Sequence, residues 1–297
     1  TPYSKLEAVI FVGSYTGEIV RYILQTDQSY PSTCSFGHNT KIVQFAECTL
    51  PVIQNGIVSL SYDGTVCVWS VLDGICYQRF HQILPKGCQR IACANTAIEI
   101  AAISGAFPNI YILNLQTGEI ISQIRPIPKF PVCLEFYSEG DAEWLFALGA
   151  NGCASFTSLT PKTASSNRFG LFNPEDEFLL DAVPSPDFNF LILIYSHGYA
   201  LVGLFSPSFP KYARNDCPNI RTAVWCTKTQ FALIQFDGSF SAYELTPPST
   251  EITPDIIIKN ITYKTNTYIN SSLMNKNSEE IFEFKRKLIQ NVQPLNQ

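Results

Sequence analysis

The chain has 297 residues, of which 46% are hydrophobic and 15% are charged, and its formal net charge is −5. A disordered chain combines low hydrophobicity with high charge, so this composition predicts a folded domain with a sizeable core. The negative charge disfavours a nucleic-acid partner bound through its phosphates. The longest apolar run, residues 188–205, is broken by Asn189, Ser196 and His197 and is too polar for a membrane-spanning helix.

Ten cysteines occur in the sequence, and none forms a Cys-x-x-Cys pair. Cys67, Cys133 and Cys226 lie in apolar, strand-like stretches. A disulfide framework is typical of smaller secreted chains, so we interpret the cysteines as buried thiols in a reducing compartment and expect a cytoplasmic protein. The sequence opens at Thr1 without an initiator methionine or a signal peptide, so we expect a piece of a longer polypeptide.

A pattern of two strands joined at a glycine turn repeats along the chain. The first copy spans residues 9–22 with its turn at Gly17, and the clearest copy spans residues 37–69 with an Asp63-Gly64 turn. Asp-Gly between two apolar strands is a strong hairpin signal, because glycine readily adopts the positive φ that the turn needs. We therefore expect a β-hairpin at each copy.

The later copies lie in phase with the first two. Their turns fall at Pro108-Asn109, Gly152, Gly198 and Gly238. With Gly17 and Gly64 this gives six turns about 40–47 residues apart, close to the roughly 40–45 residues of a four-stranded β-propeller blade. Two further turns, at Gly74 and Gly118, lead into outer strands, and residues 120–125 have the more polar composition expected of one.

The unit that begins at Gly37 and ends at Trp69 resembles the WD40 repeat, although Ser70 stands where the family has Asp. The resemblance implies an all-β fold, namely a WD40-like β-propeller. Six blade units are visible, whereas seven are usual for the family. The ring would be either six blades closed by the tail or seven with the last outside this sequence. The first unit would lack its innermost strand because the sequence begins at Thr1.

The WD40 resemblance also implies a buried hydrogen-bond network. In the family it links the Gly-His histidine, the turn Asp, a strand hydroxyl and the Trp. The matching residues are His38, Asp63, either Ser59 or Ser61, and Trp69. Buried polar groups persist only when they are paired, so we expect the network to stabilise the fold as a unit.

We predict a propeller over residues 1–263 and a polar linker with a short amphipathic helix over residues 264–297. Within the first region, residues 255–263 could form one more strand. The helix would begin at Ser278, which can cap it. We interpret its apolar face as docking on the propeller or on a following domain rather than on a membrane.

Catalysis or metal binding needs converging groups, and the sequence offers no such set. The repeat explains His38, and His81 and His197 lack a second ligand at a metal-binding spacing. No phosphate loop or Gly-x-Ser-x-Gly elbow occurs, and we interpret the acidic runs at 139–143 and 175–177 as solvated loops. We therefore predict no catalytic, cofactor-binding or metal site, no cofactor and no enzyme activity. An enzyme would require distant carboxylates to meet in a central channel.

We expect function in the loops, because a rigid repeat frame presents them as a shared surface. The longest loops are residues 26–36, 159–173 and 206–218. The last two combine basic residues with four aromatic ones: Phe169, Phe172, Phe209 and Tyr212. Aromatic side chains beside arginine are typical of binding hot spots. Anchoring of each residue against its own blade is the alternative.

Three segments go beyond the generic repeat: residues 36–38, 69–76 and 105–113. On these segments residues 1–245 resemble the amino-terminal propeller of rabconnectin-3 beta-type proteins. The resemblance implies a protein–protein interaction scaffold in vesicle trafficking, with a second rabconnectin-type subunit and vacuolar proton-pump (V-ATPase) subunits as partners. Its partners would hold it peripherally on endosomal, Golgi or vacuolar membranes. The alternative is a peptide-binding propeller of an unrelated trafficking or signalling scaffold.

Overall fold

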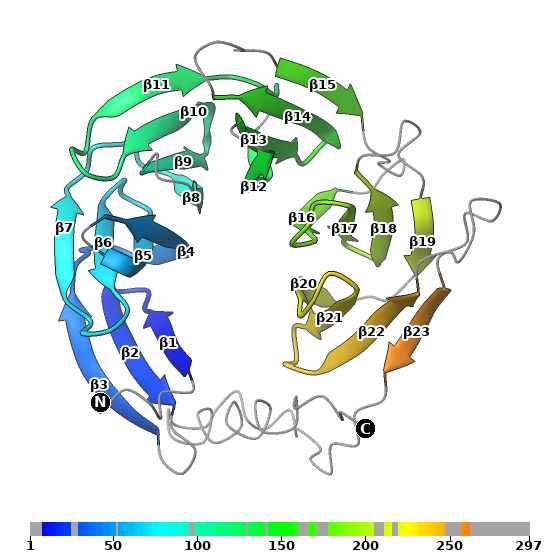
Figure 1. The fold of residues 1–297 in the computed structure, drawn as a ribbon, viewed down its shortest axis with the longest axis horizontal. Coiled ribbons are helices and arrows are strands. Elements are labelled where there is room, and N and C mark those ends of the chain that lie inside the picture. The colour runs from blue at the N-terminus through cyan, green and yellow to red at the C-terminus, as the bar shows by residue number, and fades with distance from the viewer. Residues whose placement is uncertain are drawn as a thin grey trace. The chain divides into compact units, whose positions relative to one another are not determined.

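The computed structural model describes residues 8–24, 29–51, 53–94, 99–128, 130–139, 142–159, 166–170, 178–204, 211–215, 219–246 and 257–261. All regular structure in these ranges is β, in antiparallel sheets of three or four strands (Figure 1). The predicted all-β class is therefore confirmed for this part of the chain. The same ranges contain no helix that could cross a membrane. The predicted linker and helix after residue 263 lie outside them.

The chain divides into two compact units, and the first is Thr1–Leu171. Its described strands form sheet 1 from β1 (Ala8–Gly13), β2 (Glu18–Leu24) and β3 (Ser29–Phe36); sheet 2 from β4 (Ile42–Leu50), β5 (Ile53–Ser61), β6 (Val66–Ser70) and β7 (Cys76–Phe80); sheet 3 from β8 (Cys88–Cys93), β9 (Ile100–Gly105), β10 (Phe107–Asn114) and β11 (Ile120–Ile124); and sheet 4 from β12 (Pro131–Glu139), β13 (Ala142–Gly149), β14 (Cys153–Ser158) and β15 (Ser166–Gly170). In every sheet, neighbouring strands follow one another in the sequence.

The second unit, Phe172–Gln297, repeats this plan. Sheet 5 consists of β16 (Leu179–Pro184), β17 (Phe190–Tyr195), β18 (Tyr199–Gly203) and β19 (Lys211–Asn215), and sheet 6 of β20 (Ile220–Trp225), β21 (Gln230–Gln235), β22 (Phe240–Thr246) and β23 (Ile257–Ile261). The strand predicted within residues 255–263 is confirmed as β23, which pairs antiparallel with β22.

Burial follows the order of the strands within a sheet. Every residue of β6, β9 and β18 is buried, whereas exposed and half-buried residues alternate in β7 and dominate β11. A strand covered on both faces forms a continuous apolar run, and one covered on a single face alternates. The polar run at residues 120–125 was therefore correctly predicted as an outer strand.

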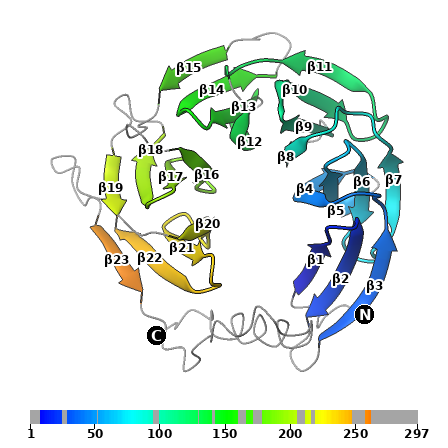
Figure 2. The ribbon, with the colours of Figure 1, turned by 180° about the vertical axis from the view of Figure 1, so that it is seen from behind.

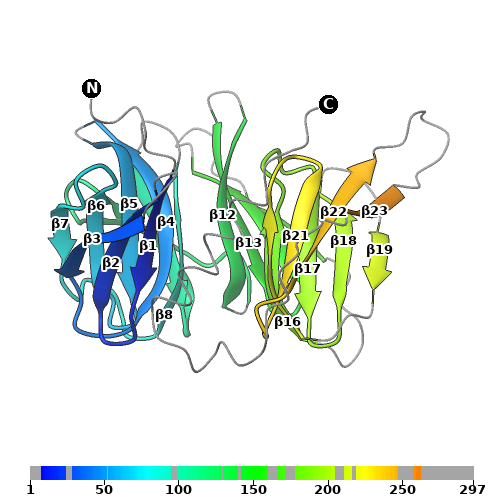
Figure 3. The same ribbon diagram turned by 90° about the horizontal axis from the view of Figure 1, so that it is seen from below.

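Neighbouring sheets within each unit lie side by side. In the first unit β8 contacts both β4 and β12 (Figure 1, Figure 2), and in the second unit β20 contacts β16 and β17. Figure 3 shows the antiparallel strands of sheets 1 and 2 from the side. Apolar side chains fill the space between sheets. For example, Leu60 and Val68 of sheet 2 belong to the same buried cluster as Ile91 and Ile103 of sheet 3.

Polar side chains also join neighbouring sheets by donating to backbone carbonyls. The buried Arg21 of β2 donates from Nε to Val71 O at 2.9 Å, and Arg90 of β8 donates from Nε to Val132 O at 2.8 Å. Guanidinium groups are permanently charged donors, so these bonds are stronger than neutral ones. The sheets are thus held by directional bonds as well as by apolar packing.

The predicted glycine turns join the second and third strands of the four-stranded sheets, and β1 to β2 in sheet 1. The turn residues have positive φ: Gly17 95°, Gly64 85°, Gly152 75° and Gly238 83°. Gly198 lies in the β17–β18 turn, where Tyr195 N donates to its carbonyl at 2.8 Å. Gly74 and Gly118, which precede outer strands, also have positive φ, 74° and 75°. These predicted positions are confirmed.

The turn predicted at Pro108-Asn109 is wrong. The chain reverses at Ala106 instead, because Gly105 already pairs with Phe107, and residues 108–109 belong to β10. The register of β10 shifts between Phe107 and Tyr111. Proline cannot donate a ladder hydrogen bond, so this irregular stretch accommodates it without a turn.

Two of the turn glycines allow a test of close packing between sheets. A Cβ on Gly64 would lie 2.2 Å from Leu84 O, whereas a Cβ on Gly238, with nearly the same φ, would meet nothing within 4 Å. We expect Gly238→Ala to lower the free energy of unfolding by about 1 kcal/mol through backbone strain. Gly64→Ala should lower the free energy of unfolding by about 1–3 kcal/mol more than Gly238→Ala does, because its new methyl group would be overpacked against the next loop.

Urea unfolding followed by tryptophan fluorescence measures both losses, because Trp69 and Trp144 lie in the first unit and Trp225 in the second. Equal losses for the two variants would contradict the close approach of Gly64 to the next loop.

Candidate functional site

The repeat unit of sheet 2 contains a buried hydrogen-bond chain centred on Ser59. Trp69 Nε1 donates to Ser59 Oγ at 2.8 Å, and His38 Nε2 lies 2.6 Å from the same oxygen. All three residues are buried. Ser59, rather than Ser61, is therefore the strand hydroxyl that joins the histidine to the tryptophan.

Asp63 belongs to a second set of hydrogen bonds, contrary to the single network predicted. Its carboxylate accepts from the Ser61 hydroxyl, from Thr65 N at 3.1 Å and from Gln82 Nε2 at 3.4 Å. His38 Nδ1 has no hydrogen-bond partner in the described part of the chain. His38 and Asp63 therefore belong to separate sets of hydrogen bonds, one centred on Ser59 and one on the turn.

The pKa values of His38 and Asp63 are both lowered, but for different physical reasons. Burial lowers the pKa of His38 to about 4, with a raising influence from Asp63 and a lowering one from Arg79. For Asp63, burial acts to raise the pKa, but the hydrogen bonds from Ser61, Thr65 and Gln82 outweigh it and the pKa lies below its usual value. At neutral pH the histidine is neutral and the aspartate is charged.

Above these buried groups, turns and loops of sheets 1 to 3 are joined by backbone hydrogen bonds. We call residues 14–17, 37–42, 62–64 and 81–87 the loop platform. Its bonds run from Ile42 N to Ser14 O (3.2 Å), from Tyr62 N to Lys41 O (3.0 Å) and from Gly87 N to Tyr62 O (2.8 Å). Each segment is thereby fixed to the next, so the platform is a rigid support for its side chains.

The side chains that the platform presents are aromatic and basic. Tyr15 is 81% exposed and Tyr62 is 40% exposed. Lys41 Nζ lies 4.5 Å from the ring centroid of Tyr62 and 5.9 Å from that of Tyr15, within the range of cation–π attraction. The neighbouring Lys86 is exposed. Tyrosine beside a cation is the composition typical of binding hot spots.

Sequence reasoning missed this cluster although a signal was present. The platform turns have matching sequences, Ser14-Tyr-Thr-Gly17 and Ser61-Tyr-Asp-Gly64, so a tyrosine precedes each turn glycine by two residues. An aromatic residue repeated at the same position of two turns indicates a shared aromatic surface at that end of the sheets.

The structure places the predicted binding loops differently. Residues 29–36, 166–170 and 211–215 of those loops form strands β3, β15 and β19. Outer strands pair through their backbones and need little apolar pattern, which is why these polar stretches were taken for loops. Phe169 stacks on Phe156 with ring centroids 6.0 Å apart, which favours the anchoring alternative. The side chains of Phe172, Phe209 and Tyr212 lie outside the described part.

The expectation that the acidic run at residues 139–143 lies in a solvated loop was wrong for Glu143. Glu143 is 2% exposed in β13 and accepts a hydrogen bond from Ser138 Oγ at 2.8 Å. Its carboxylate therefore bonds across the β12–β13 pair rather than facing solvent.

Most of the described cysteines are buried, as the sequence predicts. Among the described residues eight cysteines are free, and both Cys67 and Cys133 are buried, whereas Cys226 is exposed and was predicted wrongly. Burial raises the pKa of Cys48 to about 11, which keeps its thiol protonated. A search of the described residues finds no group of three or more His, Cys, Asp or Glu that could hold a metal ion.

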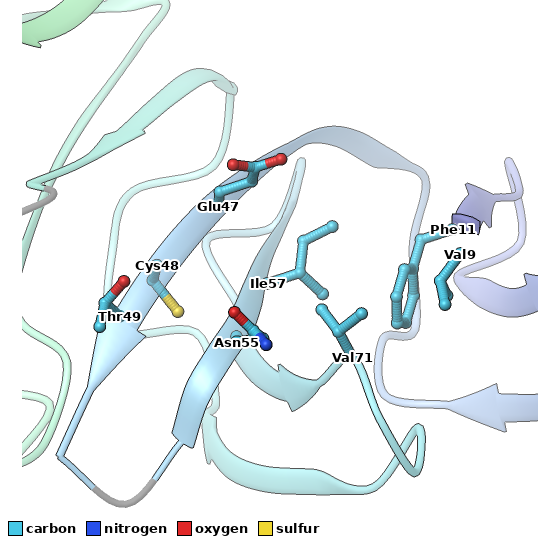
Figure 4. A pocket seen from close by; sticks show the side chains of 9 residues that line it. Val9, Phe11, Glu47, Cys48, Thr49, Asn55, Ile57 and Val71 are labelled. Atoms are coloured by element: carbon cyan, nitrogen blue, oxygen red, sulfur yellow. The ribbon is translucent and has the colours of Figure 1, made fainter. Parts of the chain in front are cut away.

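A pocket of about 290 Å³ lies between β1 and strands β4 and β5 (Figure 4). Val9 and Phe11 approach it from one side, Ile57 and Val71 lie across from them, and Glu47 stands at its edge. In sheets 3, 4 and 6 the first strand packs against the first strand of the sheet before it. The pocket lies at a similar place beside the three described strands of sheet 1. Its lining mixes apolar side chains with Glu47, Thr49 and Asn55, and we assign it no ligand.

Comparison with protein-family models and with curated protein sequences gave no match for this chain. The observed class is an all-β protein of repeated antiparallel sheets. Its loop platform, an exposed aromatic and basic surface on a buried polar support, is the feature from which a function can be inferred.

The two Asp-Gly turns of sheets 2 and 6 test the Asp63 hydrogen bonds. Asp63→Ala leaves the Thr65 amide without its acceptor and the Ser61 hydroxyl with only Thr65 O, at 3.2 Å, and each unsatisfied buried group costs about 1–3 kcal/mol. Asp237 has the same place in its turn and accepts from Ser239 N at 2.8 Å, but it is exposed, so water can replace the lost acceptor. Urea unfolding should show that Asp63→Ala lowers the free energy of unfolding more than Asp237→Ala does. Equal decreases for the two variants would disprove the buried role of Asp63.

The pKa of His38 predicts how stability depends on pH. Folding lowers this pKa from 6.5 to about 4, so in that range the unfolded chain binds a proton that the folded chain does not. The contribution of neutral His38 to the free energy of unfolding is therefore fully present above about pH 6.5. It falls by up to about 3 kcal/mol as the pH drops toward 4. Urea unfolding at several pH values should show this slope in the wild type and in His197→Gln, whose site is exposed. His38→Gln should remove it, and an unchanged slope would refute the assignment.

Proposed function

We propose that the chain is a WD40-like β-propeller that acts as a protein–protein interaction scaffold. The repeated strand order of sheets 2 to 6 and the glycine turns support a propeller. The hydrogen bonds of Ser59 to His38 and Trp69 support the WD40 type in particular, because they join the residues that the resemblance matches. Within the proposal, strands build the blades and the loops between them are left for partners.

The observation that carries the binding function is the Tyr15, Lys41 and Tyr62 cluster. Large tyrosine rings are exposed on a support whose segments are joined by backbone hydrogen bonds. A rigid surface loses little conformational entropy when a partner binds, so more of the contact energy appears as affinity. Nothing in this arrangement calls for a chemical step, and the proposed output is binding without catalysis.

The partners proposed follow from the sequence resemblance. A rabconnectin-3 beta-type protein would bind a second rabconnectin-type subunit and subunits of the vacuolar proton pump, and would regulate pump assembly on endosomal, Golgi or vacuolar membranes. A second candidate is a peptide-binding propeller of another trafficking or signalling scaffold. The exposed loop platform favours this candidate equally, because its chemistry suits any polypeptide partner with a complementary surface.

Affinity recovery from membranes tests the function and its site together. A tagged protein should recover proton-pump subunits or a rabconnectin-type partner, and the double change Tyr15→Ala and Tyr62→Ala should reduce recovery. Hot-spot truncations cost at least about 2 kcal/mol, or roughly thirtyfold in affinity. Tyr77→Ala is the matched control, because Tyr77 is 49% exposed but lies in β7, outside the platform.

The identity of what is recovered separates the two candidates. Recovery of unrelated proteins that still depend on the platform tyrosines would favour the unrelated scaffold. Equal recovery with the platform and control variants would remove the platform from the proposal. Turnover of a small substrate by the purified protein would contradict a scaffold without catalysis.

A further inference from the structure

The charges of the loop platform differ in sign from those of the chain as a whole. The chain has a formal net charge of −5, but Lys41 and Lys86 lie on either side of Tyr62 in the platform. The carboxylate of Asp63 is buried beneath them and is occupied by its own donors. Glu18, next to the platform, accepts from Thr16 Oγ1 at 3.1 Å. Glu18 keeps its charge, because a single hydroxyl donor does not neutralise a carboxylate. The platform itself therefore presents basic and aromatic groups, with one acidic residue at its border.

The position of Lys41 is defined more closely than that of an ordinary surface lysine. Its ammonium lies near the rings of both Tyr15 and Tyr62, and its carbonyl accepts the Tyr62 amide at 3.0 Å. A lysine already held in place loses less side-chain entropy on forming an ion pair. A carboxylate arriving here would meet a fixed ammonium, and an adjoining apolar side chain would meet two exposed rings.

We propose that the loop platform binds an extended acidic segment of a partner protein, in which carboxylates alternate with apolar or aromatic side chains. Lys41 and Lys86 would pair with the carboxylates, and the rings of Tyr15 and Tyr62 would cover the apolar side chains. This inference rests on the proposed scaffold function and specifies the chemistry of its partner. Like charges elsewhere on the acidic chain would repel such a segment, which directs it to the platform.

Three synthetic octapeptides serve as probes: the acidic EDFDELEF, its amide counterpart QNFNQLQF and the basic KRFKKLKF. Fluorescence anisotropy with the full chain should show the acidic peptide binding at least about tenfold more tightly than the amide peptide, a difference of about 1.4 kcal/mol. The preference should shrink as salt rises from about 0.05 to 0.5 M, because partly exposed charges are screened. The basic peptide should bind no more tightly than the amide peptide.

Paired variants locate the binding. Lys41→Gln with Lys86→Gln should abolish most of the preference for the acidic peptide, whereas Lys228→Gln, an exposed lysine in a turn of the second unit, should leave it unchanged. Tyr15→Ala should weaken both the acidic and the amide peptide, and Tyr77→Ala neither. Unfolding curves for each variant show whether the fold is retained, and the lysine changes lie at surface positions that leave the buried hydrogen bonds intact.

Four results would overturn the inference. They are equal binding of acidic and amide peptides, loss of binding in the Lys228 variant to the same extent as in the platform variant, stronger binding of the basic peptide, and full competition by anionic phospholipid vesicles with no dependence on the tyrosines. If membrane recovery of partners still depends on Tyr15 and Tyr62 while the peptides fail, the scaffold function stands and only the acidic chemistry is wrong. If both experiments fail, the scaffold function fails as well.

Discussion

The turn glycine of one sheet and the loop leading into the next sheet approach so closely that no side chain fits between them. A Cβ on Gly17 would lie 2.5 Å from His38 O, and one on Gly64 would lie 2.2 Å from Leu84 O. This spacing lets the backbone groups of adjacent sheets reach one another, as in the 2.8 Å bond that Gly87 N donates to Tyr62 O. Packing of the apolar cores and rigidity of the loop platform both depend on this contact.

The buried polar groups of sheet 2 are organised around two hydroxyls rather than one network. Ser59 joins His38 to Trp69, and Ser61 joins Asp63 to its own turn. Because the two sets are separate, breaking the hydrogen bonds of one set leaves the groups of the other set with their partners. The separation also leaves His38 Nδ1 without a partner in the described part of the chain, so burial controls the protonation of the ring more than the aspartate does.

The hairpins could be predicted from the sequence because their signal is local. Asp63-Gly64 requires only a positive φ between two apolar strands, and the strand predicted around residue 257 needed only its apolar run. The turn assigned to Pro108 failed for the opposite reason: proline indicates an interruption, but an irregular strand satisfies it as well as a turn does. Outer strands such as β15 are set by backbone pairing with their neighbour, which leaves little trace in the sequence.

The candidate site was harder to predict, because exposure and neighbourhood are properties of the folded chain. Phe169 lies in a segment with the composition of a hot spot but packs on Phe156, whereas Tyr15, which the sequence analysis did not single out, is 81% exposed. Lys41 becomes distinctive only when the loop that carries it meets two turns that are distant in the sequence. The spacing of residues within one segment of the sequence cannot reveal a contact among three segments.

The buried polar groups and Tyr62 of the exposed cluster occur in the same repeat unit, and sheet 6, which has a similar turn, provides a comparison. Sheet 6 has the same Asp-Gly turn, but its aspartate is exposed, and the sheet is held by an apolar cluster that includes Phe231 and Leu233. Apolar packing alone is therefore compatible with this hairpin. Buried polar groups contribute little net stability beyond apolar packing but fix geometry, because each has few satisfactory partners. Sheet 6 also carries an exposed aromatic side chain beside a cation, because Phe236 is 53% exposed and Arg221 lies 5.4 Å from its ring centroid, so such a pair forms without buried polar groups. What the buried groups of sheet 2 add beneath Tyr62 and Lys41 is a turn held by directional hydrogen bonds.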